Sequence, residues 1–312
     1  YELGIPVKTR HNEVAPGQYE IAPSYENANV ASDHQMLLME VMKATAEAHG
    51  FRCLLHEKPF AGVNGSGKHN NWSVATDTGK NLLSPGKSPQ DNPQFLTFLC
   101  AVIRAVDMHA DLLRASVASA ANDHRLGANE APPAIISIFL GEMLSDILDQ
   151  IESDESRSAI SGGTLHLGPE AMVDINLDSG DRNRTSPFAF TGNKFEFRAV
   201  GSTSTIAWPN TILNTIIAES LDYIATNLES TLAGSTSVEQ RDTAVRALLK
   251  DILRKHRKVV FDGDNYAQAW HDEADRRGLP NLTTAPDAFP ALVTEKALQL
   301  FEHYSVLSNR EL

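Results

Sequence analysis

The stretch from Glu57 to Ser73, EKPFAGVNGSGKHNNWS, says more about this protein than any other part of its sequence. Its motif Gly62-x-x-x-x-Gly67-Lys68 has the spacing of a P-loop, in which main-chain N–H groups and the Lys hold phosphates. A P-loop continues with Ser or Thr and then the start of a helix, but here His69 follows. The next residues, 70–73, are typical of a strand, so this stretch predicts a loop that leads into a strand.

Side chains in a strand alternate between two faces. His69, Asn71 and Ser73 therefore share one face of the predicted strand, and Trp72 lies on the other. This arrangement puts a metal-ligand type beside two side chains that can form hydrogen bonds.

Three glutamates stand in patterns that suit a metal ion. Glu13 and Glu20 flank a Pro-Gly turn, so two short strands could bring their carboxylates together. Glu196 alternates with Phe195 and Phe197, which places it on the polar face of a strand. Exposed glutamates and surface salt bridges are the ordinary alternatives for all three. Together with His69 they would form an oxygen-rich site suited to Mg²⁺ or Mn²⁺.

The composition excludes several classes of protein. The 312 residues, 42% of them apolar, can bury a sizeable core, and the net charge of −13 disfavours nucleic acids and anionic membranes as partners. No apolar run approaches the roughly 20 residues of a membrane span. Cys53 and Cys100 are too few for a disulfide framework, so we expect a cytoplasmic protein.

The segment Asn64-Gly65-Ser66-Gly67-Lys68-His69-Asn70-Asn71-Trp72-Ser73 resembles the ATP and substrate signature of glutamine synthetases, with wording closest to the type III class. Four other segments resemble motifs of the same family in the same order: Glu13–Glu20, Arg125–Pro132, Asn183–Phe188 and Lys194–Arg198. The resemblance implies an α+β fold in which a curved antiparallel sheet, flanked by helices, lines the active site.

The resemblance also implies a role for each matching residue. Glu13 and Glu20 would bind one divalent metal, Mg²⁺ or Mn²⁺, and His69 and Glu196 a second one that bridges the ATP phosphates. The remaining roles are substrate binding by Asn64, Gly65, Arg125 and Arg198, ATP binding by Asn71, Ser73 and Arg184, and catalysis by Arg184 and Glu130. Arg184 would act on the transferred phosphate, and Glu130 would accept a proton from ammonium.

The activity implied by the resemblance is ATP-dependent ligation of ammonia to L-glutamate through a γ-glutamyl phosphate intermediate, in a large homo-oligomer. Three alternatives stay open at this point. The chain could be a γ-glutamyl ligase of the same superfamily that uses an amine, or a non-catalytic scaffold relative that keeps the fold. A metal-free hydrolase with paired carboxylates would explain the glutamates but would leave His69 and the arginines without a role.

We expect a catalytic part at residues 1–233 and a helical C-terminal part at residues 234–312. The predicted helices begin near Ser32 or Asp33, at Pro93 and at Ile135, and further helices are expected at 206–232, 236–257, 264–277 and 290–308. Strands are expected within 1–30, 51–55, 165–177 and 189–200.

Two further metal-binding glutamates of the family come from a Glu-x-Glu strand, and no Glu-x-Glu occurs in these 312 residues. We therefore interpret the chain as an internal part of a longer protein, and we expect it to be inactive by itself.

Overall fold

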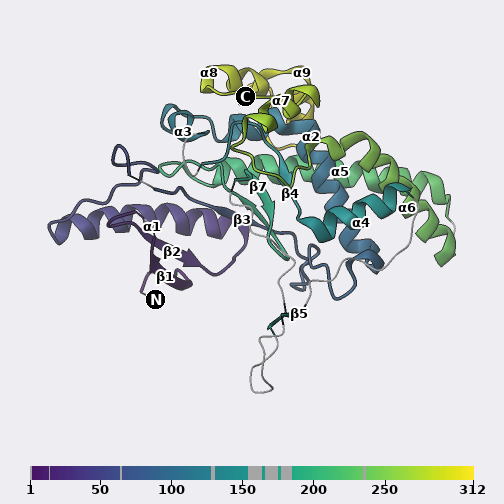
Figure 1. Ribbon diagram of the computed structural model, residues 1–312, viewed down its shortest axis with the longest axis horizontal. Coiled ribbons are helices and arrows are strands. Elements are labelled where there is room, and N and C mark those ends of the chain that lie inside the picture. Colours follow the sequence, from purple (N-terminus) through teal and green to yellow (C-terminus); the bar gives the residue numbers. More distant parts are fainter. Residues whose placement is uncertain are drawn as a thin grey trace.

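The computed structural model describes residues 2–13, 15–63, 65–127, 131–153, 164–165, 175–176, 185–234 and 237–312. These residues form a group of helices around a four-stranded sheet, with a two-stranded hairpin near the N-terminus (Figure 1). The predicted α+β class is confirmed. Among the described helices, none is long and apolar enough to cross a membrane.

Helix α2 (Pro93–Ser116) is the centre of the fold. The Asn92 side chain caps it by accepting a hydrogen bond from the Phe95 N–H at 3.1 Å, and Pro93 fills the first turn, where no donor is needed. Buried side chains lie on all sides of α2, because helices α5 (Ala207–Leu232) and α6 (Val238–His256) both pack against it. These three helices confirm the expectations for 206–232 and 236–257 and the start at Pro93.

The sheet places one strand of the signature stretch inside the fold. Its order is β3 (Asn70–Trp72), β8 (Phe195–Phe197), β7 (Phe188–Phe190) and β4 (Ile138–Phe139). The pairs β3–β8 and β7–β8 are antiparallel, as expected, but β4 runs parallel to β7. Phe188 stacks on Phe195 with ring centroids 4.7 Å apart, so the apolar faces of β7 and β8 fix their register.

The N-terminal hairpin consists of β1 (Val7–Asn12) and β2 (Tyr19–Pro23), and helix α1 (Ala28–Ala48) follows it. Asn27 caps α1 by accepting a hydrogen bond from the Asn29 N–H at 3.1 Å. The predicted cap at Ser32 or Asp33 is wrong, because Asn27 provides an earlier cap and the first turn forms there.

Two other predictions of secondary structure are wrong. Residues 51–55 form no strand: Phe51 is 72% exposed and Leu54 is 57% exposed, so these apolar side chains have no core to enter. The helix expected from Ile135 begins only at Glu142, because residues 138–139 pair as β4 and Gly141, with φ of +83°, interrupts the chain.

The remaining elements are short. They are η1 (Pro89–Asp91), α3 (Ala120–Arg125), α4 (Glu142–Ser153), β5 (Thr164–Leu165), β6 (Ile175–Asn176), η2 (Arg257–Val259), α7 (Gln268–Arg276), α8 (Ala285–Ala288), η3 (Phe289–Val293) and α9 (Glu295–His303). Helices α7 and α9 confirm the helices expected at 264–277 and 290–308, with narrower bounds. The strands expected at 165–177 lie largely outside the described residues.

A buried ion pair joins α2 to α5. Arg104 donates to the two carboxylate oxygens of Glu219 at 2.5 and 3.0 Å, and its guanidinium lies 4.2 Å from the ring centroid of Tyr223. Burial raises the pKa of the Glu219 carboxyl, but His109 and Arg104 outweigh this effect and hold that pKa at about 2. Ionised Glu219 therefore stabilises the fold, by about 3 kcal/mol at neutral pH.

We expect Glu219→Gln to lower the free energy of unfolding at pH 7 by about 3 kcal/mol. Because the folded-state pKa is depressed, this contribution is complete above the ordinary value of 4.5 and disappears as the pH falls towards 2. Urea unfolding at pH 7 and at pH 3 measures the difference, with the exposed Glu229→Gln on the same helix as control. An equal loss at both pH values would contradict the ion-pair explanation.

Candidate active site

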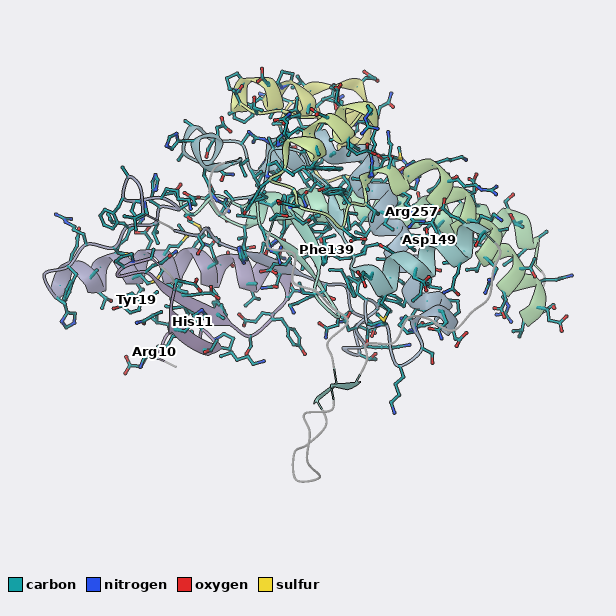
Figure 2. All side chains as sticks on the ribbon, viewed as in Figure 1. Arg10, His11, Tyr19, Phe139, Asp149 and Arg257 are labelled. Atoms are coloured by element: carbon teal, nitrogen blue, oxygen red, sulfur yellow. The ribbon has the colours of Figure 1, made fainter. Side chains whose placement is uncertain are left out.

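The hairpin brings three potential ligands together. The β1–β2 register sets His11 opposite Glu20, and Glu13 follows directly after β1. His11 Nε2 lies 2.7 Å from a Glu13 oxygen and 3.8 Å from a Glu20 oxygen, and one ligand atom from each of the three lies within 4.8 Å of the others. The structure thus unites Glu13 with Glu20, as the sequence predicted. His11 sits on the same hairpin, where it is labelled in Figure 2.

His11 is not among the site residues predicted from the sequence. The signal was its position two residues before Glu13, because residues that are two apart share a face of a strand. That Glu20 lies opposite His11 follows from the hairpin register, and the register is set by the geometry of the turn.

The two hairpin carboxyls influence each other. Partial burial and the nearby Glu13 carboxylate raise the pKa of Glu20. Burial also acts to raise the pKa of Glu13, but its hydrogen bonds with His11 and Glu20 outweigh burial and lower that pKa. The hairpin is therefore a place where negative charge is concentrated and where a divalent cation would relieve the repulsion.

A second pair lies on the sheet. His69 Nδ1 is 2.6 Å from a Glu196 oxygen, and Arg198 donates to the other Glu196 oxygen at 3.0 Å. Burial raises the pKa of Glu196, but the contacts with His69 and Arg198 bring it down to about 2. The charge of His69 contributes to the lowered pKa of Glu13 and opposes the rise in the pKa of Glu20, so the hairpin pair and the sheet pair share one electrostatic environment.

The donor set of these two pairs fits a hard divalent cation. Glu13, Glu20 and Glu196 supply carboxylate oxygens and His69 an imidazole nitrogen, a combination that suits Mg²⁺ or Mn²⁺. The same four side chains lack the sulfur ligands that are typical of structural zinc.

We expect Glu20→Gln to weaken Mn²⁺ binding at least about tenfold, because it removes one ligand charge from the hairpin. Titration of bound Mn²⁺ by electron paramagnetic resonance measures the affinity without any need for turnover. The exposed Glu40→Gln on α1 is the matched control. Unchanged Mn²⁺ affinity in Glu20→Gln would remove Glu20 from the ligand set.

Hydrogen bonds connect the loop before β3 to the hairpin and to the residues with which the loop begins. Gln18 donates to the carbonyl oxygen of Ser66 at 3.1 Å and to its hydroxyl at 3.2 Å. Lys58 donates to the Gly65 carbonyl at 2.6 Å. The loop predicted to bind substrate is therefore fixed on the side where the hairpin carboxylates lie.

Arg125 and Arg198, the two described arginines of the predicted substrate site, both have protein partners. Arg125 is 3% exposed and donates to the carbonyl oxygens of Val200 at 3.1 Å and Arg198 at 2.6 Å, and to the Asn122 side chain at 3.0 Å. Burial lowers the pKa of Arg125 from its usual value. Arg198, a predicted substrate-binding residue, contacts Glu196, a predicted metal ligand.

Two of the predicted ATP-binding residues lie at β3, Asn71 within the strand and Ser73 directly after it. Asn71 is exposed and opposite Glu196 in the β3–β8 register, whereas Asn70 and Trp72 are buried, which confirms the alternation. Ser73 donates to Asn81 at 2.9 Å and to the carbonyl oxygen of Asn193 at 3.1 Å, so it joins β3 to two loops. Asn64, Glu130 and Arg184 lie outside the described residues.

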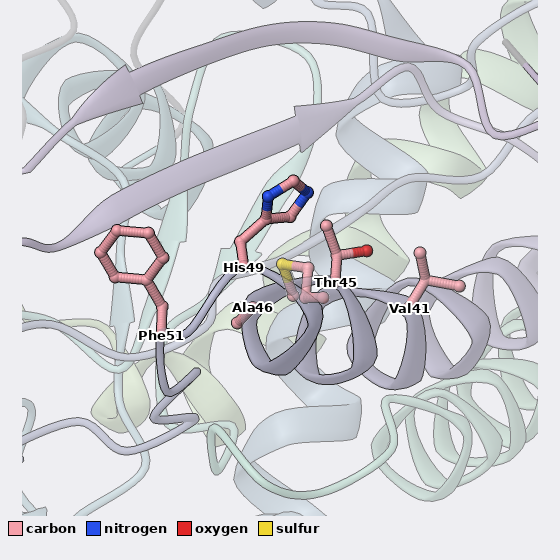
Figure 3. A pocket seen from close by; sticks show the side chains of 6 residues that line it. Val41, Thr45, Ala46, His49 and Phe51 are labelled. Atoms are coloured by element: carbon pink, nitrogen blue, oxygen red, sulfur yellow. The ribbon is translucent and has the colours of Figure 1, made fainter.

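An apolar hollow of about 480 Å³ lies elsewhere, at the C-terminal end of α1. Figure 3 shows the side chains that line it, from Val41, Met42, Thr45, Ala46, His49 and Phe51. None of the predicted site residues belongs to this lining, and the lining offers no carboxylate. The candidate site is therefore the polar region between the hairpin and β8.

Comparison with known proteins agrees with the geometry. The family model "Glutamine synthetase, catalytic domain" matches residues 1–137, and "Glutamine synthetase C-terminal domain" matches residues 244–312. The chain is 54% identical over all 312 residues to the type-3 glutamine synthetase of Dictyostelium discoideum, of which it covers 42%. It is 49% identical over 312 residues to the glutamine synthetase of Butyrivibrio fibrisolvens, of which it covers 44%. The chain thus spans less than half the length of these relatives.

Proposed function

Because the chain belongs to the glutamine synthetase family, we propose that it forms most of an active site that joins ammonia to L-glutamate at the expense of ATP. The observation that carries this proposal is the His69–Glu196 contact of 2.6 Å beside the Glu13–Glu20 hairpin. These side chains come from the motifs that resemble the metal segments of the family.

Divalent cations held by Glu13, Glu20, His69 and Glu196 would neutralise the charge on the transferred γ-phosphoryl group of ATP. The chain's own residues would do the rest. Asn64 and Gly65 would bind the amino acid, and the guanidiniums of Arg125 and Arg198 would attract its carboxylate. Asn71, within β3, and Ser73, directly after it, would contact ATP.

Arg184 and Glu130 would act during the two steps of the reaction. Arg184 would stabilise the phosphate as it moves to the glutamate side chain, which becomes an acyl-phosphate. Glu130 would then attract ammonium and accept one of its protons, because ammonium becomes a nucleophile only after it loses a proton. Ammonia would then attack the acyl carbon, and phosphate would leave.

Other parts of the proposal concern the whole protein. We place residues 1–233 in the catalytic domain and residues 234–312 in a helical C-terminal domain, and the family match at 244–312 supports this division. A large homo-oligomer in the cytoplasm is also proposed. The free thiols of Cys53 and Cys100 are consistent with a reducing compartment.

The test of the proposed function is a glutamine assay on a purified protein that contains these 312 residues and spans the length of the relatives, with L-glutamate, ammonium, ATP and Mn²⁺. Formation of glutamine with equal amounts of ADP and phosphate supports the proposal. Methylamine in place of ammonium tests the amine-using alternative, because a better rate with methylamine would overturn the assignment of ammonia.

We also expect the 312-residue chain by itself to form glutamine at least about a hundredfold more slowly than a protein that spans the length of its relatives. Phosphoryl transfer depends on the position of the phosphate, and a displacement of about 1 Å can cost a hundredfold. The same assay on both proteins at equal concentration measures the ratio. Similar rates would show that the 312 residues supply every group that the reaction needs.

A further inference from the structure

We propose that Glu57 is a positioning residue for glutamate binding, a role that rests on the proposed function and that the mechanism above does not include. Its carboxylate is buried against Ser202 and is not one of the groups predicted to bind substrate. Glu57 fixes the position of this loop and of Arg125 relative to the segment 198–204. The affinity for glutamate depends on that relative position.

Glu57 touches the loop with both its main chain and its side chain. Its side chain is buried, with the residue 2% exposed, and accepts a hydrogen bond from the Ser202 N–H. A Cβ atom on Gly65 would lie 2.3 Å from the Glu57 carbonyl oxygen, and one on Gly67 would lie 3.0 Å from the Glu57 Cγ. Glycine is therefore required at position 65, where the neighbour is main chain, whereas a Cβ atom at position 67 would crowd the side chains of Arg125 and Glu57.

The carboxylate of Glu57 also balances the buried cation of Arg125 and the half-buried cation of Lys68. A Cβ atom on Gly67 would lie 2.8 Å from the Arg125 Cζ, so Glu57 and Arg125 face each other across this glycine. Burial lowers the pKa of Arg125, and the negative charge of Glu57 opposes this effect. Without that charge, the buried guanidinium would have less compensation, which is costly in a protein interior.

Three buried or half-buried side chains hold the segment 198–204 at every second residue. Arg125 donates to the carbonyl oxygens of residues 198 and 200, Glu57 accepts from the N–H of residue 202, and Lys68 donates to the carbonyl oxygen of residue 204. Glu57 and Lys68 come from the stretch Glu57–Ser73, and Arg125 comes from the end of α3. Glu57 is the one anion among them, so its charge holds the two cations beside the segment.

The segment 198–204 leads directly to the predicted site. Arg198 begins it and contacts Glu196 at 3.0 Å. Arg125, Arg198 and Gly65 are all proposed to bind glutamate. If the loop shifts relative to this segment, the two arginines move relative to Gly65 and glutamate binds more weakly. The residues proposed to contact ATP, Asn71 within β3 and Ser73 directly after it, are positioned by the pairing of β3 with β8.

The test uses steady-state kinetics of the purified, assembled protein with Glu57→Gln. Glutamine keeps the oxygen that accepts from Ser202 but removes the charge. We expect the KM for glutamate to rise at least about tenfold, with the KM for ATP changed less than about twofold. Glu57→Asp, which restores the charge, should recover most of the affinity, and the exposed Glu47→Gln is the matched control.

Two outcomes would overturn the inference. An unchanged KM for glutamate in Glu57→Gln would show that the charge has no positioning role. Equal increases in the KM values for glutamate and ATP would show a general structural role instead. If Glu57→Gln does not fold, Gly67→Ala provides the second test, because its methyl group pushes Arg125 away from Glu57 and should raise the KM for glutamate in the same selective way.

The wild-type measurement separates this inference from the proposed function. If the wild-type protein forms glutamine and the Glu57 variants bind glutamate normally, only the positioning role fails. If the wild-type protein forms no glutamine with any of the substrates above, the proposed function fails and the positioning role falls with it.

Discussion

Replacing Glu196 by glutamine is expected to lower kcat for glutamine formation by a factor on the order of 10³. Glutamine has nearly the same shape as glutamate, so the change removes a charge and little else. Glu196 is held by His69 at 2.6 Å and by Arg198 at 3.0 Å, and its pKa of about 2 keeps it ionised throughout the physiological range. A fixed negative charge at Glu196 would hold a divalent cation beside the phosphates of ATP.

The measurement is kcat at saturating glutamate, ammonium and ATP over a range of Mn²⁺ concentrations. Glu239→Gln, at an exposed position of α6, is the control for general effects of the substitution. Full recovery of kcat at high Mn²⁺ would show that Glu196 contributes affinity for the metal but no positioning. A kcat within about twofold of wild type at every Mn²⁺ concentration would remove Glu196 from the active site.

The second large effect is expected for Gly65→Ala. The new Cβ would lie 2.3 Å from the main-chain oxygen of Glu57, far inside the normal contact distance, and main chain cannot rotate away as a side chain can. The loop must therefore move as a unit, and Lys58 would lose its 2.6 Å hydrogen bond to the Gly65 carbonyl. Displacing a substrate loop by about 1 Å costs roughly a hundredfold in kcat/KM.

Gly79→Ala is the matched control for this prediction. Gly79 has φ of +82° and no neighbour within 4 Å of an added Cβ, so alanine there causes backbone strain without a collision. We expect Gly79→Ala to reduce stability by about 1 kcal/mol and to leave kcat/KM for glutamate nearly unchanged. Equal kinetic losses in both variants would mean that the effect at position 65 does not depend on the contact with Glu57.

The sequence by itself determined the features that depend on neighbouring residues. The apolar periodicity of α2, α5 and α6 was sufficient to find these helices, because each helix buries a face that repeats along its own length. The alternation around Asn71 and around Glu196 was equally local, since any strand sends successive side chains to opposite faces. The paired carboxylates Glu13 and Glu20 followed from a turn between two short strands.

The tertiary structure alone decided what lies between distant segments. The parallel pairing of β4 with β7 depends on how residues 138 and 188 meet, and the exposure of Phe51 depends on what covers it. His11 joins the hairpin carboxylates through the β1–β2 register, and Glu57 meets Ser202 across 145 positions of the chain. Local patterns carry no information about such contacts, because a side chain's partners and its burial are set by the packing of the whole fold.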